Sequence, residues 1–276
     1  KSKNTGFSKV VVFTFILLFT LSAMSLEKNS HEFPFELSGT KEAFLFSAGL
    51  GFMTSFFFEK SVAMSDLEMR DLDSSDINSF DRCATELYSE KSSRASDIIL
   101  GTVMAAPVLF FADKRLNRDF RNAATFAVMY AESLMLLNGI TETFKVSVQR
   151  KRPYAYNESL SYKKRTSGDY NLSFLSGHTS NAFNSAVFLS TVFTFANPDS
   201  KWVPVVWTVS LSAASTIAVL RVVSGKHYPT DVIAAAVLGS VTGLFIPLLH
   251  KVNKKNFSVI PVVSSEYGGL QAVLNF

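Results

Sequence analysis

The sequence is poor in charge and in cysteine, and each shortage excludes a class of protein. Charged residues make up 18% of the 276 residues and hydrophobic ones 47%, and the mean hydropathy is +0.20. Such an apolar chain is not an ordinary soluble domain and is typical of a small membrane protein. The single cysteine, Cys83, excludes an internal disulfide and a cysteine-based metal cluster, and we expect it to be a small buried or lining residue. The formal net charge of +4 is too small to indicate a nucleic-acid partner.

The first 25 residues have the pattern of a targeting segment. Lys1, Lys3 and Lys9 precede an apolar run from Val10 to about Leu21, and Ala23 to Ser25 offer a small-residue cleavage site. This pattern predicts a secretory signal peptide or an uncleaved N-terminal anchor. Either one sends the following chain across a membrane.

Five later segments are long enough, or nearly so, to cross a membrane as helices: 95–112, 123–144, 181–196, 202–220 and 232–249. A sixth apolar run, 43–58, is of borderline length. Small residues such as Gly239 recur in these segments and let helices pack closely in lipid. We therefore predict an all-α, polytopic transmembrane bundle of five to six spans. A soluble all-α protein with buried helices is the alternative.

These patterns divide the chain into four parts. Residues 1–25 are the signal peptide or anchor, 26–94 an N-terminal region that contains the run 43–58, 95–250 the membrane domain, and 251–276 a C-terminal tail. In the tail, β-branched runs flank Gly268 and Gly269, which predicts a short β-hairpin.

The loop DKRLNRDFR, residues 113–121, sets the predicted orientation. It lies between two apolar segments and carries four basic residues against two acidic ones, so the positive-inside rule places it in the cytoplasm. If the five spans alternate, the loops 145–178 and 221–231 face the outside. A spanning helix at 43–58 after an exported N-terminus would reverse this result, so we expect that run to be re-entrant or to lie on the membrane surface.

Two polar clusters at the ends of apolar segments have the composition of an anion site. KVSVQRKRP contains Lys145 and Arg152, which are seven residues apart and can share one helix face. FLSGHTS places Ser176, Gly177 and His178 at the start of a helix, where free backbone N–H groups and the helix dipole favour an anion. An alternative is that basic residues at a span end simply anchor a helix to lipid headgroups, which would explain the whole run 150–152.

The third cluster, RVVSGKHYPTD, combines a cation with acid–base groups. Arg221 can hold an anion, and Pro229 fits the first turn of the final helix. Asp231 follows His227 by four residues, close enough to hydrogen-bond the imidazole and fix its tautomer. Charged side chains beside hydrocarbon are energetically costly, so we expect these residues to have a functional role.

In this order, the clusters resemble the three signature motifs of the type 2 phosphatidic acid phosphatase (PAP2) family: Lys-x6-Arg-Pro, Ser-Gly-His and Arg-x5-His-x3-Asp. The resemblance covers about residues 95–250, which would then be the catalytic membrane domain of the PAP2/haloperoxidase-like type. Two positions depart from the family pattern. Leu175 stands where Pro is common and Leu220 where Ser is frequent, and the chemistry needs neither residue.

The resemblance implies a role for each motif residue. His227 would attack phosphorus and form a phosphohistidine, with Asp231 orienting it, and His178 would act as general acid and then general base. The phosphoryl oxygens would be held by the remaining motif residues, Lys145, Arg152, Ser176, Gly177 and Arg221. No metal or other cofactor is implied, because the cations take the place of Mg²⁺.

The predicted partners are a lipid phosphate substrate and membrane lipids, with no nucleic acid and no indication of oligomeric state. Substrate candidates are polyprenyl diphosphate, phosphatidic acid or phosphatidylglycerol phosphate, and the phosphates of lipid A. The basic run 163–165 would guide an anionic headgroup or bind anionic lipid. The expected location is a bacterial-type inner membrane with the site facing the periplasm or exterior. His31 and His250 match no motif and are predicted to be surface or helix-end residues.

Three alternatives come from other functional classes. A lipid phosphotransferase would pass the phosphoryl group to an alcohol. A vanadate-dependent haloperoxidase uses a similar pocket but is soluble, which the many spans oppose. A non-catalytic lipid-phosphate binder would keep the cations without the nucleophile, whereas this chain has both histidines and Asp231.

Overall fold

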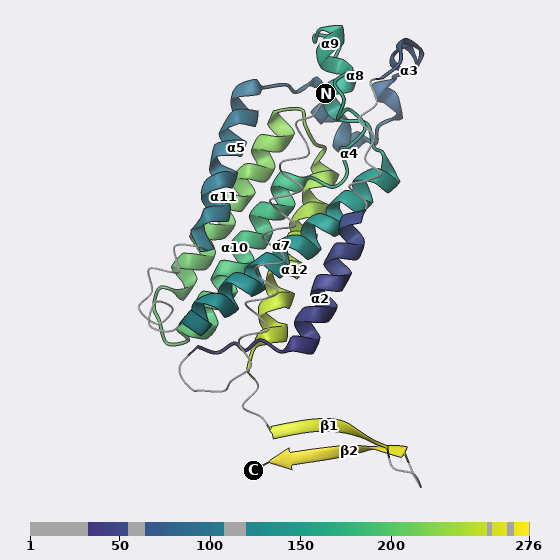
Figure 1. Ribbon diagram of the computed structural model, residues 1–276. Coiled ribbons are helices and arrows are strands. Elements are labelled where there is room, and N and C mark those ends of the chain that lie inside the picture. The colour runs from purple at the N-terminus through teal and green to yellow at the C-terminus, as the bar shows by residue number, and fades with distance from the viewer. Residues whose placement is uncertain (1–32, 55–63, 108–119, 253–255, 264–267, 276) are drawn as a thin grey trace.

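The computed structural model describes residues 33–54, 64–107, 120–252, 256–263 and 268–275. Within these residues, long helices lie side by side in a bundle (Figure 1): α2 (Gly39–Met53), α5 (Glu90–Ala105), α7 (Phe120–Val148), α10 (Gly177–Ala196), α11 (Val203–Val223) and α12 (Pro229–His250). The predicted all-α fold is thereby confirmed. The predicted signal peptide or anchor, His31 and most of the loop 113–121 lie outside the described residues.

The central helix is α10, which packs against α5, α7, α11 and α12. Its contact with α12 is close because two glycines face it. A Cβ on Gly239 would lie 2.2 Å from the Ser180 carbonyl oxygen, and one on Gly243 would lie 2.5 Å from that of Asn184. The predicted close packing at Gly239 is therefore present, and it brings the N-terminal ends of α10 and α12 together.

Polar side chains inside the bundle bind one another. Asn184 Nδ2 donates to Ser133 Oγ at 2.6 Å and to Thr242 Oγ1 at 2.8 Å, which joins α10 to α7 and α12. Because unpaired polar groups are costly inside an apolar bundle, these bonds fix how the three helices are aligned.

Three helices are long and apolar enough to cross a membrane, judged by length and composition of the described residues: Phe120–Tyr156, Val203–Val223 and Pro229–His250. They correspond to the predicted spans 123–144, 202–220 and 232–249. Valines such as Val209 and Val237 are exposed on their outer faces, as suits lipid. The predicted spans 95–112 and 181–196 fall on α5 and α10, so the number of spans stays a prediction.

The described part of the run 43–58 belongs to α2, which packs against α7. Its 15 residues extend roughly 22 Å, less than the hydrocarbon core of about 30 Å. In the tail, β1 (Asn256–Val263) and β2 (Gly268–Asn275) pair in antiparallel fashion. A single bridge between Phe35 and Lys251 joins the chain before α2 to the chain after α12.

Short helices cover the end of the bundle where the motifs lie (Figure 1): α3 (Asp66–Arg70), η2 (Ser74–Asp76), α4 (Ser79–Arg82), η3 (Cys83–Glu86), α8 (Pro153–Tyr156) and α9 (Tyr162–Arg165). One prediction about a single residue is wrong here. Cys83 is exposed, not buried or lining, whereas its neighbours Ala84 and Thr85 in η3 are buried. His250 ends α12 as predicted, but its side chain is buried and not on the surface.

Candidate active site

The predicted site residues all lie where helices begin or end at one end of the bundle. Lys145 stands in the last turn of α7, and Ser176 is the N-cap of α10, followed by Gly177 and His178. Arg221 ends α11. His227 precedes α12 and Asp231 lies in its first turn. Direct contacts join His227 to Arg152, and Asp97 joins His178 to Arg221. The charges of Arg152 and Arg221 act on both histidines, so the two groups are neighbours.

His227 is held with one ring nitrogen fixed and the other facing a cation. Its Nδ1 lies 2.7 Å from the Ser173 carbonyl oxygen, so it donates its proton there. The Nε2 atom therefore keeps its lone pair, and Arg152 Nη1 lies 3.3 Å from it. Burial, together with the charges of Arg152 and Arg221, lowers the pKa of His227 to about 3, so the ring is neutral at physiological pH.

The predicted hydrogen bond between Asp231 and His227 is wrong. Asp231 Oδ2 lies 3.8 Å from His227 Nδ1, which is too long for a hydrogen bond. The carboxylate instead accepts from Ser173 Oγ at 2.5 Å, from the Tyr228 backbone N–H at 2.9 Å and from Arg150 Nη1 at 2.5 Å. Ser173 thus links the two residues, since its hydroxyl binds Asp231 and its carbonyl binds the imidazole.

Arg150 points into the protein, contrary to the alternative that it anchors the helix to headgroups. It binds Asp81 Oδ2 and Thr230 Oγ1, each at 2.8 Å, and its guanidinium lies 4.0 Å from the Tyr228 ring centre. Burial alone would raise the pKa of Asp81, yet hydrogen bonds from Thr230 and Arg150 lower it below its usual value. The acidic segment before α5 therefore supplies a buried anion that fixes the start of α12, and no pattern in the sequence indicated this pairing.

Arg152 is also fixed by several contacts. Its Nε donates to the Asp169 carbonyl at 2.8 Å, its Nη1 to the Lys226 carbonyl at 3.2 Å, and its Nη2 lies 3.2 Å from Asp169 Oδ2. Burial would raise the pKa of Asp169, but the charges of Arg152 and Lys226 bring it down to about 2. The carboxylate is thus ionised, and it holds the guanidinium beside His227.

His178 and Arg221 share an acidic partner that comes from α5. Asp97 Oδ1 lies 2.8 Å from His178 Nε2 and 3.5 Å from Arg221 Nη1. Burial and the charge of Arg221 lower the pKa of His178 to about 4, while Asp97 opposes that shift. The sequence interpretation missed Asp97, although an acidic residue inside a predicted span was a usable signal.

Arg221 faces α5 with part of its guanidinium still available. Its Nη1 lies 3.3 Å from Ser96 Oγ and 3.4 Å from Ser93 Oγ. Its Nε is buried without a hydrogen-bond partner among the described residues. A pocket of about 340 Å³ opens beside it, lined by Tyr88, Ser89, Glu90, Ser93, Arg94, Ser224 and Lys226.

Lys145 and the start of α10 form the remaining side of the site. Lys145 Nζ lies 2.6 Å from Glu142 Oε1, and a Cβ added to Gly177 would lie 3.4 Å from this ammonium. Ser176 caps α10, accepting from the Thr179 backbone N–H at 3.4 Å. A helix N-terminus beside an ammonium group favours binding of an anion.

The basic run 163–165 is partly occupied by contacts within the protein. Lys164 Nζ binds Glu90 Oε1 at 2.8 Å and Arg165 Nε donates to the Ala155 carbonyl at 2.8 Å. Lys226 was not singled out in the sequence, although its ammonium lies 4.9 Å from the Tyr154 ring centre and it lines the pocket. Burial, together with the charges of Arg152 and Arg221, lowers its pKa, while the charge of Asp169 opposes that shift.

The fold and this cluster define a class of protein: a helical membrane protein that holds a buried neutral histidine among cations at its helix ends. Residues 126–255 match the model of the PAP2 superfamily, and this range includes all eight predicted site residues. This part of the chain belongs to the PAP2 superfamily. The match confirms the family predicted from the three motifs, and with it the predicted class of enzyme, a phosphoric ester hydrolase.

Among solved structures, the chain is similar to a transmembrane PAP2-type phosphatidylglycerolphosphate phosphatase from Bacillus subtilis. The identity is 16%, the TM-score is 0.40, and the match covers 87% of this chain and 94% of that chain. No curated protein matches the chain.

Proposed function

We propose that this protein is an integral-membrane phosphatase that removes phosphate from a lipid phosphate or diphosphate through a phosphohistidine on His227, without a metal ion. The observation that carries the proposal is the state of His227. Its Nδ1 is bound to the Ser173 carbonyl, and its Nε2 lone pair faces the site beside Arg152. A neutral imidazole with one fixed N–H is a competent nucleophile.

In the first step, His227 Nε2 attacks phosphorus while the bond from phosphorus to the lipid oxygen breaks. His178 gives its proton to that leaving oxygen. In the second step, His178 takes a proton from water, and the hydroxyl displaces the imidazole from phosphorus. Phosphate leaves, and both histidines return to their starting protonation states.

The phosphoryl oxygens are held by cations and a helix N-terminus. Arg152, Arg221 and Lys145 supply the positive charge, and Ser176 with the backbone N–H of Gly177 supplies neutral donors. The unpartnered Nε of Arg221 supports this role, because a phosphoryl oxygen would give that buried donor an acceptor.

Asp231 acts as a positioning residue. It does not touch the imidazole; it holds Ser173, whose carbonyl fixes the tautomer of His227. Asp97 has the corresponding place beside His178, where its charge favours the protonated imidazole that the leaving oxygen needs.

The substrate class follows from where the site lies. Because the site stands at the ends of apolar helices, it suits a molecule with its phosphate in water and its chain in lipid. We propose a polyprenyl diphosphate, a phosphatidic acid or phosphatidylglycerol phosphate, or a lipid A phosphate. We further propose that residues 95–250 form the catalytic domain, that 1–25 direct the chain to a bacterial-type inner membrane, and that the site faces the periplasm or exterior.

Phosphate release by the detergent-purified protein tests this proposal. A panel of the lipid phosphates named above is assayed in EDTA with wild type and His227→Ala, and thermal unfolding in the same buffer checks that both are folded. We expect metal-independent release from at least one lipid and none from the variant. Loss of phosphate from the lipid only after an alcohol acceptor is added, with the phosphoryl group recovered on that alcohol, would indicate a phosphotransferase. Phosphate release that survives His227→Ala would reject the proposed nucleophile.

A further inference from the structure

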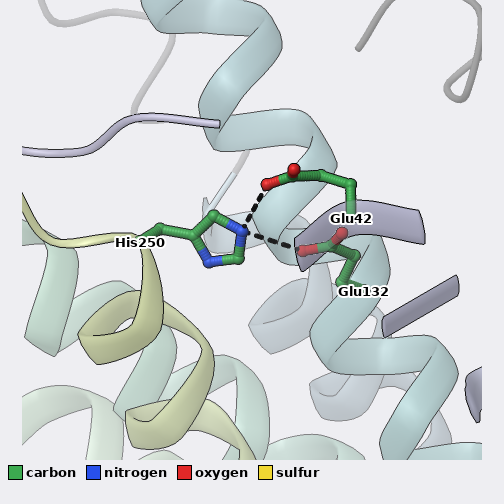
Figure 2. A group of neighbouring side chains, drawn as sticks. All are labelled: Glu42, Glu132 and His250. Carbon is green, nitrogen blue, oxygen red and sulfur yellow. Dashed lines mark hydrogen bonds and ion pairs between the residues drawn. The ribbon is translucent and has the colours of Figure 1, made fainter. Parts of the chain in front are cut away.

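A second cluster of ionisable side chains lies at the opposite end of the bundle. Figure 2 shows Glu42 of α2, Glu132 of α7 and His250 of α12 pointing toward one another. Each side chain is about 1% exposed. Asp231 and His250 stand 19 residues apart on α12, roughly 28 Å along the helix, so this cluster is separate from the active site.

The three side chains offer converging ligand atoms. His250 Nε2 lies 3.0 Å from Glu42 Oε1 and 3.3 Å from Glu132 Oε2, and one ligand atom from each residue lies within 4.8 Å of the others. Nitrogen and oxygen ligands at 2.0–2.2 Å from a shared ion, about 90–110° apart, are roughly 2.8–3.6 Å from each other. The two shorter separations fall in that range.

The surroundings orient two of these ligands. His250 Nδ1 lies 2.8 Å from the Ile246 carbonyl oxygen and donates its proton there, which leaves Nε2 with a lone pair aimed at the carboxylates. A histidine that binds a metal commonly donates its other N–H in this manner. The second oxygen of Glu42 accepts the Ser38 backbone N–H at 2.7 Å, so this carboxylate is also held in place.

The environment of Glu132 is the main evidence that the cluster binds a ligand. Both of its oxygens are buried without a hydrogen-bond partner among the described residues, although they face the other two side chains. Two ionised carboxylates beside a neutral imidazole would carry two negative charges, and a proton on His250 or on Glu132 would balance one of them. A divalent cation balances both, and it also satisfies the oxygens of Glu132.

We propose that Glu42, Glu132 and His250 bind a divalent transition-metal ion, with Zn²⁺ the best fit to one imidazole and two carboxylates. The ion ties α2 to α7 and α12 at the end of the bundle away from the active site. It has a structural role and takes no part in the proposed phosphatase reaction.

The test measures bound metal and does not measure activity. Protein without a polyhistidine tag is purified in detergent, loaded with Zn²⁺ or Mn²⁺, separated from excess metal and analysed by mass spectrometry of the elements. We expect about one Zn²⁺ per chain, as for a single three-ligand site. We expect a loss of at least about tenfold in His250→Gln and Glu132→Gln. Glu36→Gln is the matched control, since this exposed carboxylate stands six residues before Glu42 and outside the cluster.

The wild-type protein alone decides the matter if the variants do not fold. X-ray absorption at the zinc edge should show only nitrogen and oxygen neighbours, including one imidazole, and EDTA should lower the Tm. No metal on the loaded wild type would show that protons alone fill the cluster and would overturn the proposal. A sulfur atom among the zinc neighbours would also overturn the proposal. The cluster has only nitrogen and oxygen ligands, so a thiolate ligand would place the zinc at Cys83, the single cysteine of the sequence. None of these readouts depends on phosphatase activity, so each proposal can fail by itself.

Discussion

At the scale of single residues, the active site works by holding His227 in one tautomer and one orientation. The backbone carbonyl of Ser173 binds the imidazole directly. The buried Asp231 acts indirectly, because it accepts a hydrogen bond from the Ser173 hydroxyl. The arrangement differs from a triad in which the carboxylate touches the imidazole. It also keeps the carboxylate charge shared with Arg150, which lies 2.5 Å away.

This indirect arrangement predicts a moderate effect of removing the charge of Asp231. A directly bonded triad aspartate accounts for about 10⁴ in kcat. In metal sites, residues that only hydrogen-bond to a ligand typically account for about 10–100-fold in affinity or activity, and Asp231 acts on His227 in a similarly indirect way. We expect Asp231→Asn to lower kcat by about 10–100-fold with little change in KM. Ser173→Ala should give a similar loss, and the double variant should lose little more, because both changes break the same link.

Steady-state kinetics of the three variants, with the Tm of each as a check on folding, tests this. A loss near 10⁴ in Asp231→Asn alone would show that the carboxylate contacts the imidazole directly during the reaction.

The contact between Asp97 and His178 predicts how kcat/KM depends on pH. Its carboxylate raises the pKa of His178 against the opposing effects of burial and Arg221. The general acid must carry its proton, so activity is lost as pH rises through the pKa of His178. Asp97→Asn lowers that pKa, and the alkaline limb of the kcat/KM profile should therefore move to lower pH. Glu90→Gln, an exposed carboxylate on the same helix, is the control and should leave the limb in place. An unchanged limb in Asp97→Asn would argue against His178 as the acid.

How much of this site was predictable differs from residue to residue. The motif residues were predictable because their chemical types recur at fixed spacings on helix ends. Asp81 was not, since nothing in an acidic loop shows which carboxylate will pair with an arginine about 70 positions later. Ser173 was not, because its main contact comes from a backbone carbonyl, which every residue has.

At the scale of helices, the position of the motifs depends on how closely α10 and α12 approach. The two glycines of α12 lie against the backbone of α10, and they set this distance. The spans on α7, α11 and α12 were predictable from hydropathy because these helices present apolar faces outward. The predicted span 181–196 falls on α10, which is central in the bundle and whose polar side chains bind its neighbours instead of facing lipid.

The close contact predicts the cost of a single methyl group. Alanine is the better helix former, so Gly243→Ala in a loosely packed helix would stabilise it by up to about 1 kcal/mol. Here the new Cβ would lie 2.5 Å from the Asn184 carbonyl oxygen, and we expect a loss of about 1–3 kcal/mol. Thermal unfolding in detergent should show a lower Tm than wild type. Val237→Leu enlarges an exposed side chain on the same helix and should leave the Tm unchanged. An equal or higher Tm for Gly243→Ala would mean that the two helices are not in close contact.

At the scale of the whole molecule, the two ends of the bundle have different chemistry. One end gathers cations and histidines under short helices, and the other buries two glutamates and His250. If the chain crosses a membrane, these ends face opposite sides. The orientation was predicted from the loop 113–121, and the structure supplies a probe for it. Cys83 is exposed, and it lies in η3 among the short helices that cover the active-site end.

A membrane-impermeant maleimide should therefore label Cys83 in intact cells if the site faces outward. The wild type needs no engineered cysteine, since it has only this one. Cys83→Ser is the control and should take up no label. Labelling that appears only after permeabilisation would place the active site on the cytoplasmic side.

In the proposed reaction, the phosphoryl group passes through a covalent intermediate on His227. The most direct measurement is to mix the protein with a ³²P-labelled lipid phosphate that it hydrolyses, quench within the first turnovers in alkali, and locate the label by peptide mapping. We expect an acid-labile, alkali-stable label on the peptide that contains His227, and no label in His227→Ala. Phosphate release without any labelled protein, or a label that persists on His227→Ala, would contradict it.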